Sequence, residues 1–185
     1  MSAIERANAQ AQAGASFAPP VGIAEQAHAT GSYVAEFYDA AGVLRWREEF
    51  ANVVTTVGKN LALDTILAGS SYTAAWYLGL IGSAGYSAVS AADTMASHAG
   101  WTESVAYSNS TRVAPSWASA SAGSKVSTTT AFNINASDTI KGVFLNTVST
   151  KSGTTGTLYS AGLFSGGDQV VTNGGTLNVT YTAAL

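Results

Sequence analysis

The chain has one pair of adjacent carboxylates, Glu48 and Glu49, and paired carboxylates are what acid–base chemistry on a substrate would need. The residues around them, from Val43 to Phe50, have the pattern of a β-strand. Neighbouring side chains on a strand point to opposite faces, so these two cannot flank one substrate as acid and base. We expect both to be solvated or paired with Arg45 and Arg47.

A second candidate set is Asp93 and His98, five residues apart in a serine-rich stretch. A Ser-His-Asp site is recognised by its geometry, and the chain has no strand–helix elbow of the type Gly-x-Ser-x-Gly. Asp93 is better explained as the N-cap of a short helical turn, with His98 near the end of that turn. The sequence therefore predicts that the protein is not an enzyme.

Metal and cofactor chemistry also lacks suitable residues. The chain has two histidines, His28 and His98, and no cysteine, so a transition metal would depend on scattered carboxylates. Neither an EF-hand loop nor a phosphate-binding glycine loop followed by Lys-Ser/Thr is present. We expect no metal site and no cofactor.

The four tryptophans are the remaining candidates, because Trp is enriched at interaction hot spots. Trp76 lies in an apolar run and Trp101 at the start of a predicted strand, so core packing explains both. Trp46 and Trp117 are flanked by polar residues and are the better candidates for an interface. They could bind protein or stack on sugars.

The elements that would position these residues are mainly strands. Alternating patterns predict strands at 33–38, 43–50, 101–107, 112–118, 128–134, 139–148, 156–164 and 174–182, with residues 168–171 in the turn between the last two. The run Ala74–Ile81 is expected to be a strand buried on both faces. One helix is predicted after Thr55 or Thr56 and ends at Gly69. The sequence predicts a mainly β fold: an antiparallel β-sandwich or jelly-roll-like body, residues 31–185, with one α-helix.

Residues 1–30 form a separate N-terminal arm in this prediction. Alanine and glutamine dominate the arm, and Pro19 and Pro20 favour an extended backbone. Its candidate interface residues are Phe17, Pro19, Pro20 and Ile23. The arm offers too little apolar surface to order alone, so it either orders on a partner or is a frayed terminus.

Composition narrows the partners. Only 10% of the residues are charged, against about 25% in a typical soluble domain. Because few charges oppose close approach, this composition favours a protein that is packed against other protein molecules. An ordinary β domain with a polar, uncharged surface is the alternative. The net charge is −3 and the basic residues are dispersed, so we expect no nucleic acid partner. No apolar stretch approaches the ~20 residues of a membrane helix, and no secretory signal is recognisable, so we expect no membrane and synthesis in a host cytoplasm.

Several stretches of the body resemble structural proteins of tailed-bacteriophage virions. The stretches are Asn52–Gly58, Trp76–Ile81, Ala92–Glu103 with Arg112, Gly142–Leu145 and Leu177–Tyr181. The resemblance covers roughly residues 50–185 and implies a capsid cement or decoration protein on the capsid surface, with the major capsid protein as partner and a homodimer or homotrimer as its own assembly. The alternative expectation is a tail or fibre module that binds host surface glycans.

Overall fold

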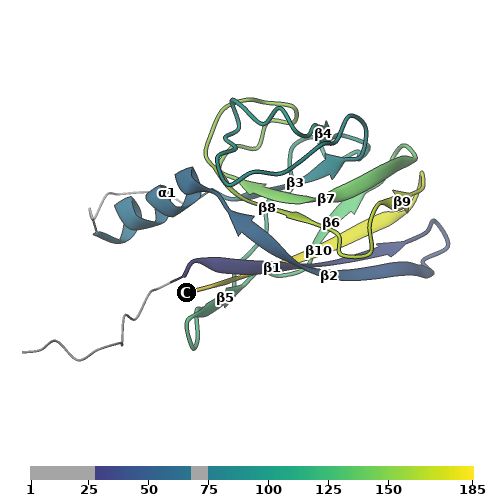
Figure 1. Ribbon diagram of the computed structural model, residues 1–185. Coiled ribbons are helices and arrows are strands. Elements are labelled where there is room, and N and C mark those ends of the chain that lie inside the picture. Colours follow the sequence, from purple (N-terminus) through teal and green to yellow (C-terminus); the bar gives the residue numbers. More distant parts are fainter. Residues whose placement is uncertain (1–27, 68–74) are drawn as a thin grey trace, which may run out of the picture.

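The computed structural model describes residues 28–67 and 75–185, and Figure 1 shows a body that is mainly β with one helix. The strands are β1 Thr30–Tyr38, β2 Leu44–Val54, β3 Tyr77–Gly82, β4 Glu103–Ser104, β5 Ser124–Val126, β6 Thr130–Asn133, β7 Asp138–Asn146, β8 Leu158–Leu163, β9 Gln169–Val171 and β10 Thr176–Ala184, and the helix is α1 Thr56–Leu67. The predicted mainly β, antiparallel fold is confirmed. The body begins at Thr30, while residues 1–27 of the predicted arm lie outside the described residues.

One folded-over sheet makes both layers of the body. The strand order is β4-β3-β7-β8-β2-β1-β10-β5, with β6 on β10 and β9 on β7, and every pairing is antiparallel. Strand β2 pairs with β1 up to Ala51 and then, over Asn52–Val54, with β8. In Figure 1, β1, β2 and β10 form the lower layer and β3, β7 and β8 the upper one. The two ends of the order, β4 and β5, are strands of two and three residues.

The hairpin from β1 to β2 follows the predicted pattern. Tyr33, Ala35 and Phe37 are buried, while the residues between them point outward. The turn uses Gly42, whose φ of 76° suits glycine, and Asp39, whose Oδ1 accepts hydrogen bonds from the N–H groups of Ala41 and Val43. These hydrogen bonds, with that from Val43 foremost, hold the pKa of Asp39 below its usual value.

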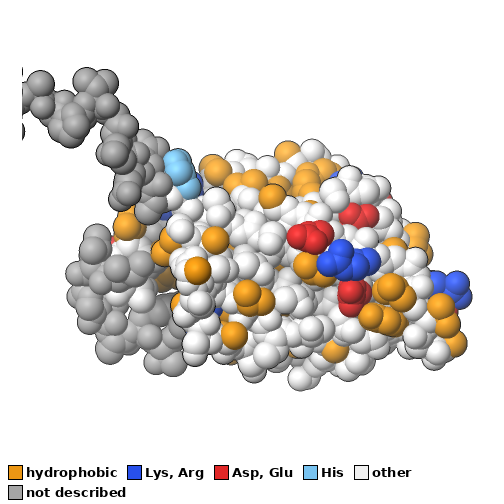
Figure 2. Space-filling view, turned by 90° about the horizontal axis from the view of Figure 1, so that it is seen from below, with side chains coloured by type: hydrophobic (Ala, Val, Ile, Leu, Met, Phe, Trp, Pro, Cys, Tyr) orange, Lys and Arg blue, Asp and Glu red, His pale blue; other side chains and the backbone are white. Residues whose placement is uncertain are grey.

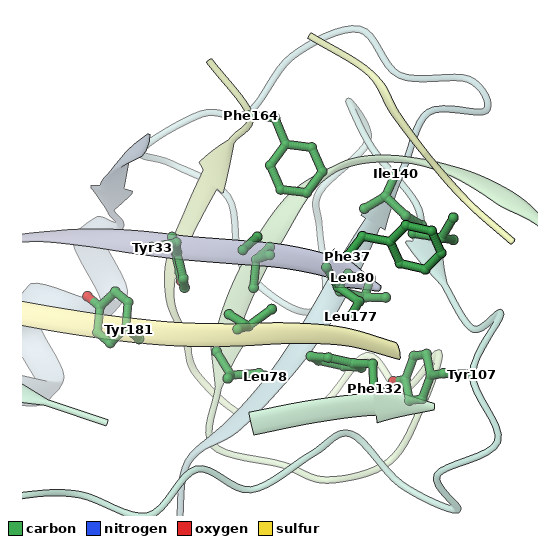
Figure 3. Packing of buried hydrophobic residues seen from close by; sticks show 14 of the residues in the cluster. Tyr33, Phe37, Leu78, Leu80, Tyr107, Phe132, Ile140, Phe164, Leu177 and Tyr181 are labelled. Atoms are coloured by element: carbon green, nitrogen blue, oxygen red, sulfur yellow. The ribbon is translucent and has the colours of Figure 1, made fainter. Parts of the chain in front are cut away.

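The main core lies between the layers (Figure 3). Side chains of β1 and β10, including Tyr33, Phe37 and Leu177, meet Leu78 and Leu80 of β3. All five are at most 1% exposed. Burial of this many aromatic and aliphatic side chains is the main force that holds the folded sheet together.

The upper layer is buried on its other face as well. A second cluster gathers Ile81 and Phe144 of the upper layer with Met95 and Trp101 of the long loop 83–102. This loop therefore forms a third layer, which covers the other face of β3, β7 and β8. The prediction that the run Ala74–Ile81 is a strand buried on both faces is confirmed for its second half, because Leu78 to Ile81 are all buried, whereas the strand begins only at Tyr77 and residues 75–77 are half-buried.

Helix α1 is fastened to β8 through its first turn. Thr55 is the N-cap: its Oγ1 accepts a hydrogen bond from the N–H of Gly58 at 3.0 Å and donates to the carbonyl of Leu158. Gly58 lies so close to β8 that a Cβ built there would be 2.4 Å from the carbonyl oxygen of Tyr159. The predicted start of the helix is confirmed, and the predicted stop at Gly69 lies outside the described residues.

The sequence prediction fails between residues 83 and 126, where few long strands form. No helix occurs between 83 and 102, and Thr94–Ser97 form a tight turn instead. The predicted strands 101–107 and 112–118 reduce to β4 and isolated bridges at Tyr107, Val113 and Trp117. The predicted linker 119–125 turns back at Ser121 and enters β5. These segments pair with a partner strand over at most three residues at a time, so alternation overestimates the length of the strands.

We predict that Gly58→Ala destabilises the fold by about 1–3 kcal/mol, because the new methyl group must displace the β8 backbone. Helix propensity alone would predict a gain of about 1 kcal/mol. Urea denaturation measures the sign. Asn60→Ala, on the exposed part of the same helix, is the control and should be neutral or slightly stabilising. A stabilising Gly58→Ala would contradict the close approach.

Candidate functional site

The two carboxylates first considered for catalysis point apart, as predicted. Glu49 is exposed and its Oε2 lies 3.5 Å from Nη2 of Arg47. Glu48 faces the turn after β8, where its carboxylate accepts hydrogen bonds from Ser165, Gly166 and Gln169 at 2.8–3.1 Å. Glu48 thus fastens the turn 165–169 to β2.

Asp93 and His98 both hold Trp101. Asp93 Oδ2 accepts a hydrogen bond from the indole N–H of Trp101 at 2.9 Å and one from the N–H of Ser90. The ring of His98 stacks on Trp101 with centroids 4.0 Å apart. The predicted role of Asp93 as a helix N-cap is wrong, because the stretch contains no helix and its carboxylate serves the buried indole instead.

A buried ion pair is the polar feature that sequence reasoning missed. Arg112 and Glu103 have side chains 0% and 4% exposed, and two N–H groups of Arg112 bind the two carboxylate oxygens at 3.0 and 2.8 Å. Arg112 also donates to the carbonyls of Val148 and Gly153, and Glu103 accepts from the N–H of Ser152. These contacts are all internal, and through them the pair fastens loop 147–157.

The candidate site is an apolar pocket of about 340 Å³ between α1 and the end of the two layers. Its lining residues come from α1, from the segments before β3 and β5, and from β5, β7, β8 and β10: Leu61, Ala62, Thr65, Trp76, Trp117, Lys125, Leu145, Tyr159, Tyr181 and Ala183. We call it the aromatic pocket. Two edge-to-face pairs stand in its wall, Trp76 with Tyr159 at 5.1 Å and Trp117 with Tyr181 at 6.1 Å.

The polar groups around the aromatic pocket are largely engaged. Thr65 Oγ1 donates to the carbonyl of Leu61, and Lys125 Nζ donates to the carbonyl of Ala118. The hydroxyl of Tyr181 accepts a hydrogen bond from Asn52 Nδ2 at 2.8 Å. Asn52 Oδ1 is the one buried side-chain oxygen without a partner among the described residues. Such a surface suits an apolar occupant, because few groups are free to hydrogen-bond a polar one.

The predicted interface residues separate in the structure. Trp117 lies in the aromatic pocket beside Tyr181, whose strand partner is Tyr33. Trp46 lies on β2, opposite Phe37, which is four residues further along β1 than Tyr33. It stacks on Phe37 and donates its indole N–H to the carbonyl of Val170. Trp46 is half-buried and belongs largely to the core rim. Phe17, Pro19, Pro20 and Ile23 lie outside the described residues.

Arg112→Met is predicted to destabilise the fold by about 3–5 kcal/mol, because it leaves the carboxylate of Glu103 buried without its partner. Urea denaturation gives the free energy of unfolding. Adding Glu103→Gln should restore part of the loss. The matched control is Arg45→Met: Arg45 is 61% exposed in its pair with Asp39, and we expect a loss below about 1 kcal/mol. Equal losses in the two variants would contradict this account.

Alkaline pH should unfold the protein through its buried tyrosines. Burial raises the pKa of Tyr33 and of Tyr181 above the ordinary value of 10.0. The folded state therefore favours the neutral hydroxyls, and this stability, complete below pH 10, is lost as pH rises above it. Tyrosinate absorbance and circular dichroism should show these tyrosines ionising together with unfolding. Ionisation of every tyrosine near pH 10 in a folded protein would contradict the prediction.

Comparison with known proteins identifies no family for this chain. Among the described residues no three His, Asp or Glu side chains gather as metal ligands. None of the helical residues described here forms a helix long and apolar enough to span a membrane. No protein-family model matches the chain, and no curated protein matches it.

Proposed function

We propose that the chain is a structural protein of a tailed-phage virion, a cement or decoration protein that binds the shell of the major capsid protein and stabilises the head. In this proposal it acts as a homodimer or homotrimer on the capsid surface. The observation that carries the proposal is the outer face of the lower layer, formed by β10, β1 and β2.

The β10 side of this outer face is uncharged, and the charged side chains of the face lie on β1 and β2. Its β10 side chains are Thr176, Asn178, Thr180 and Thr182, and β1 contributes Val34 beside Thr180. Figure 2 looks onto this side of the molecule, where uncharged atoms predominate and the few charged side chains stand close together. Arg47 joins Glu36 at 3.3 Å and Glu49 at 3.5 Å within the same layer.

A face of this kind favours a protein partner. The centres of protein interfaces are depleted in charged residues, because burying a charge removes its water. The threonine, asparagine and valine side chains of β10 and β1 lose little hydration when another protein covers them, and the charged side chains beside them are already paired with one another. The carboxylates of Glu48, Asp93 and Glu103, in contrast, each accept hydrogen bonds from other groups of the described chain and hold loops and turns in place.

Glycan binding by a tail or fibre module is the second candidate, and the aromatic pocket with Trp117 is the observation that favours it. Sugars stack on aromatic faces, but they also require several free polar groups for their hydroxyls. The Thr65 and Lys125 side chains at the pocket already bind backbone carbonyls. The capsid proposal is therefore the stronger of the two.

We predict that an added, unpaired charge on the β10 side of the outer face weakens capsid binding. Thr180→Arg should weaken co-sedimentation with phage heads assembled without the protein by at least about tenfold, since a desolvated charge costs more than 1.4 kcal/mol. Thr154→Arg, at an exposed threonine in the loop between β7 and β8, is the matched control and should bind normally.

Cryo-electron microscopy of the decorated particle gives the second readout. Many symmetric copies on the head, with the β10–β1–β2 layer against the shell, would agree with the proposal. A few copies at the tail tip, or wild-type protein that does not bind heads, would overturn it. The tail-tip result would favour the glycan candidate, which Trp117→Ala then tests.

A further inference from the structure

The start of β1 lies at the rim of the aromatic pocket. Gly31 pairs with Ala183, and Ala183 is one of the residues that line the pocket. Twenty-seven residues of chain precede the described part, and they must join the body at this point. The described chain therefore starts within reach of the pocket.

The composition of the preceding chain matches the pocket. Residues 14–24 contain no charged side chain, and they include Phe17, Pro19, Pro20, Val21 and Ile23. Proline-containing segments bind aromatic-lined grooves well, because their extended backbone is already restricted before binding. The wall formed by Trp76, Trp117, Tyr159 and Tyr181 has this aromatic character.

We infer that the aromatic pocket is the docking site for residues Phe17–Ile23 of the same chain. Six residues, 24–29, separate this segment from Thr30, and they span at most about 20 Å, which is enough to turn back onto the pocket. A connection this short gives an effective concentration in the millimolar range, so the chain's own segment outcompetes that of a second copy in dilute solution.

One polar atom agrees with this placement. Asn52 Oδ1 is buried without a partner among the described residues, and Asn52 lies beside both Tyr181 and Gly31. A segment that folds back over the start of β1 brings backbone N–H groups to this oxygen. The inference needs only a single chain in solution and does not depend on the proposed virion function.

Photo-crosslinking of the full chain tests the inference. Phe17 is replaced by p-benzoylphenylalanine, and light- and heavy-isotope chains are mixed before irradiation. Mass spectrometry should find crosslinks to peptides that contain Trp117, Tyr159 or Tyr181, always between residues of equal isotope label. Crosslinks elsewhere on the body, or crosslinks to the pocket that join light to heavy chains, would overturn the inference.

A pair of variants on α1 provides the control. Ala62 lines the pocket, so Ala62→Arg should reduce the pocket crosslinks by at least about tenfold. Leu63, its neighbour, is 55% exposed and does not line the pocket, so Leu63→Arg should leave them unchanged. Circular dichroism confirms that both variants are folded. A synthetic peptide of residues 14–24, added above the millimolar effective concentration of the tethered segment, should reduce the crosslink in the chain with Ala62 unchanged, and failure to do so at that concentration would also count against the inference.

Discussion

Strand β2 is the constraint on which the rest of the structure depends. Its first part pairs with β1 in the lower layer, and its last three residues pair with β8 in the upper layer. One strand therefore fixes the distance and the angle between the layers. The core fills the space that this shared strand defines, and the helix begins two residues after β2 ends, so α1 is placed by the same crossing.

Several of the described charged side chains fasten one part of the structure to another. Arg112 and Glu103 fasten one loop, Glu48 fastens a turn, and Lys141 of β7 pairs with Asp168 of the same turn. On the lower layer, the exposed charges of β1 and β2 pair with one another, while β10 beside them presents threonine and asparagine. The β10 side of the surface that we propose as the interface contains none of the charged side chains that fasten loops and turns.

The sequence predicted the paired strands well and the covering loops poorly. Alternation at Tyr33–Tyr38 and Leu177–Tyr181 reflects one face against a core, so period two is visible in the residues themselves. Loop 83–102 is ordered by Trp101, whose partners Asp93 and Phe144 come from the loop itself and from a distant strand. The aromatic pocket likewise joins residues 61 and 183, and only the folded sheet brings them together. A local sequence pattern does not depend on such long-range contacts. Trp117 could therefore be selected as a candidate from its own residue type, but the residues that line the pocket with it could not be predicted.

The ends of the sheet order have a consequence for crowded conditions. Unpaired edge strands invite other chains to add to a sheet, and long flat edges lead to fibrous aggregates. Here the order ends in β4 and β5, strands of two and three residues, and the neighbouring segments bridge to β3 and to Ser127. Few unpaired backbone groups therefore remain at these two ends for another chain to pair with. Many copies can therefore be held side by side at high local density without their sheets merging, even though their outer faces have few charges to keep them apart.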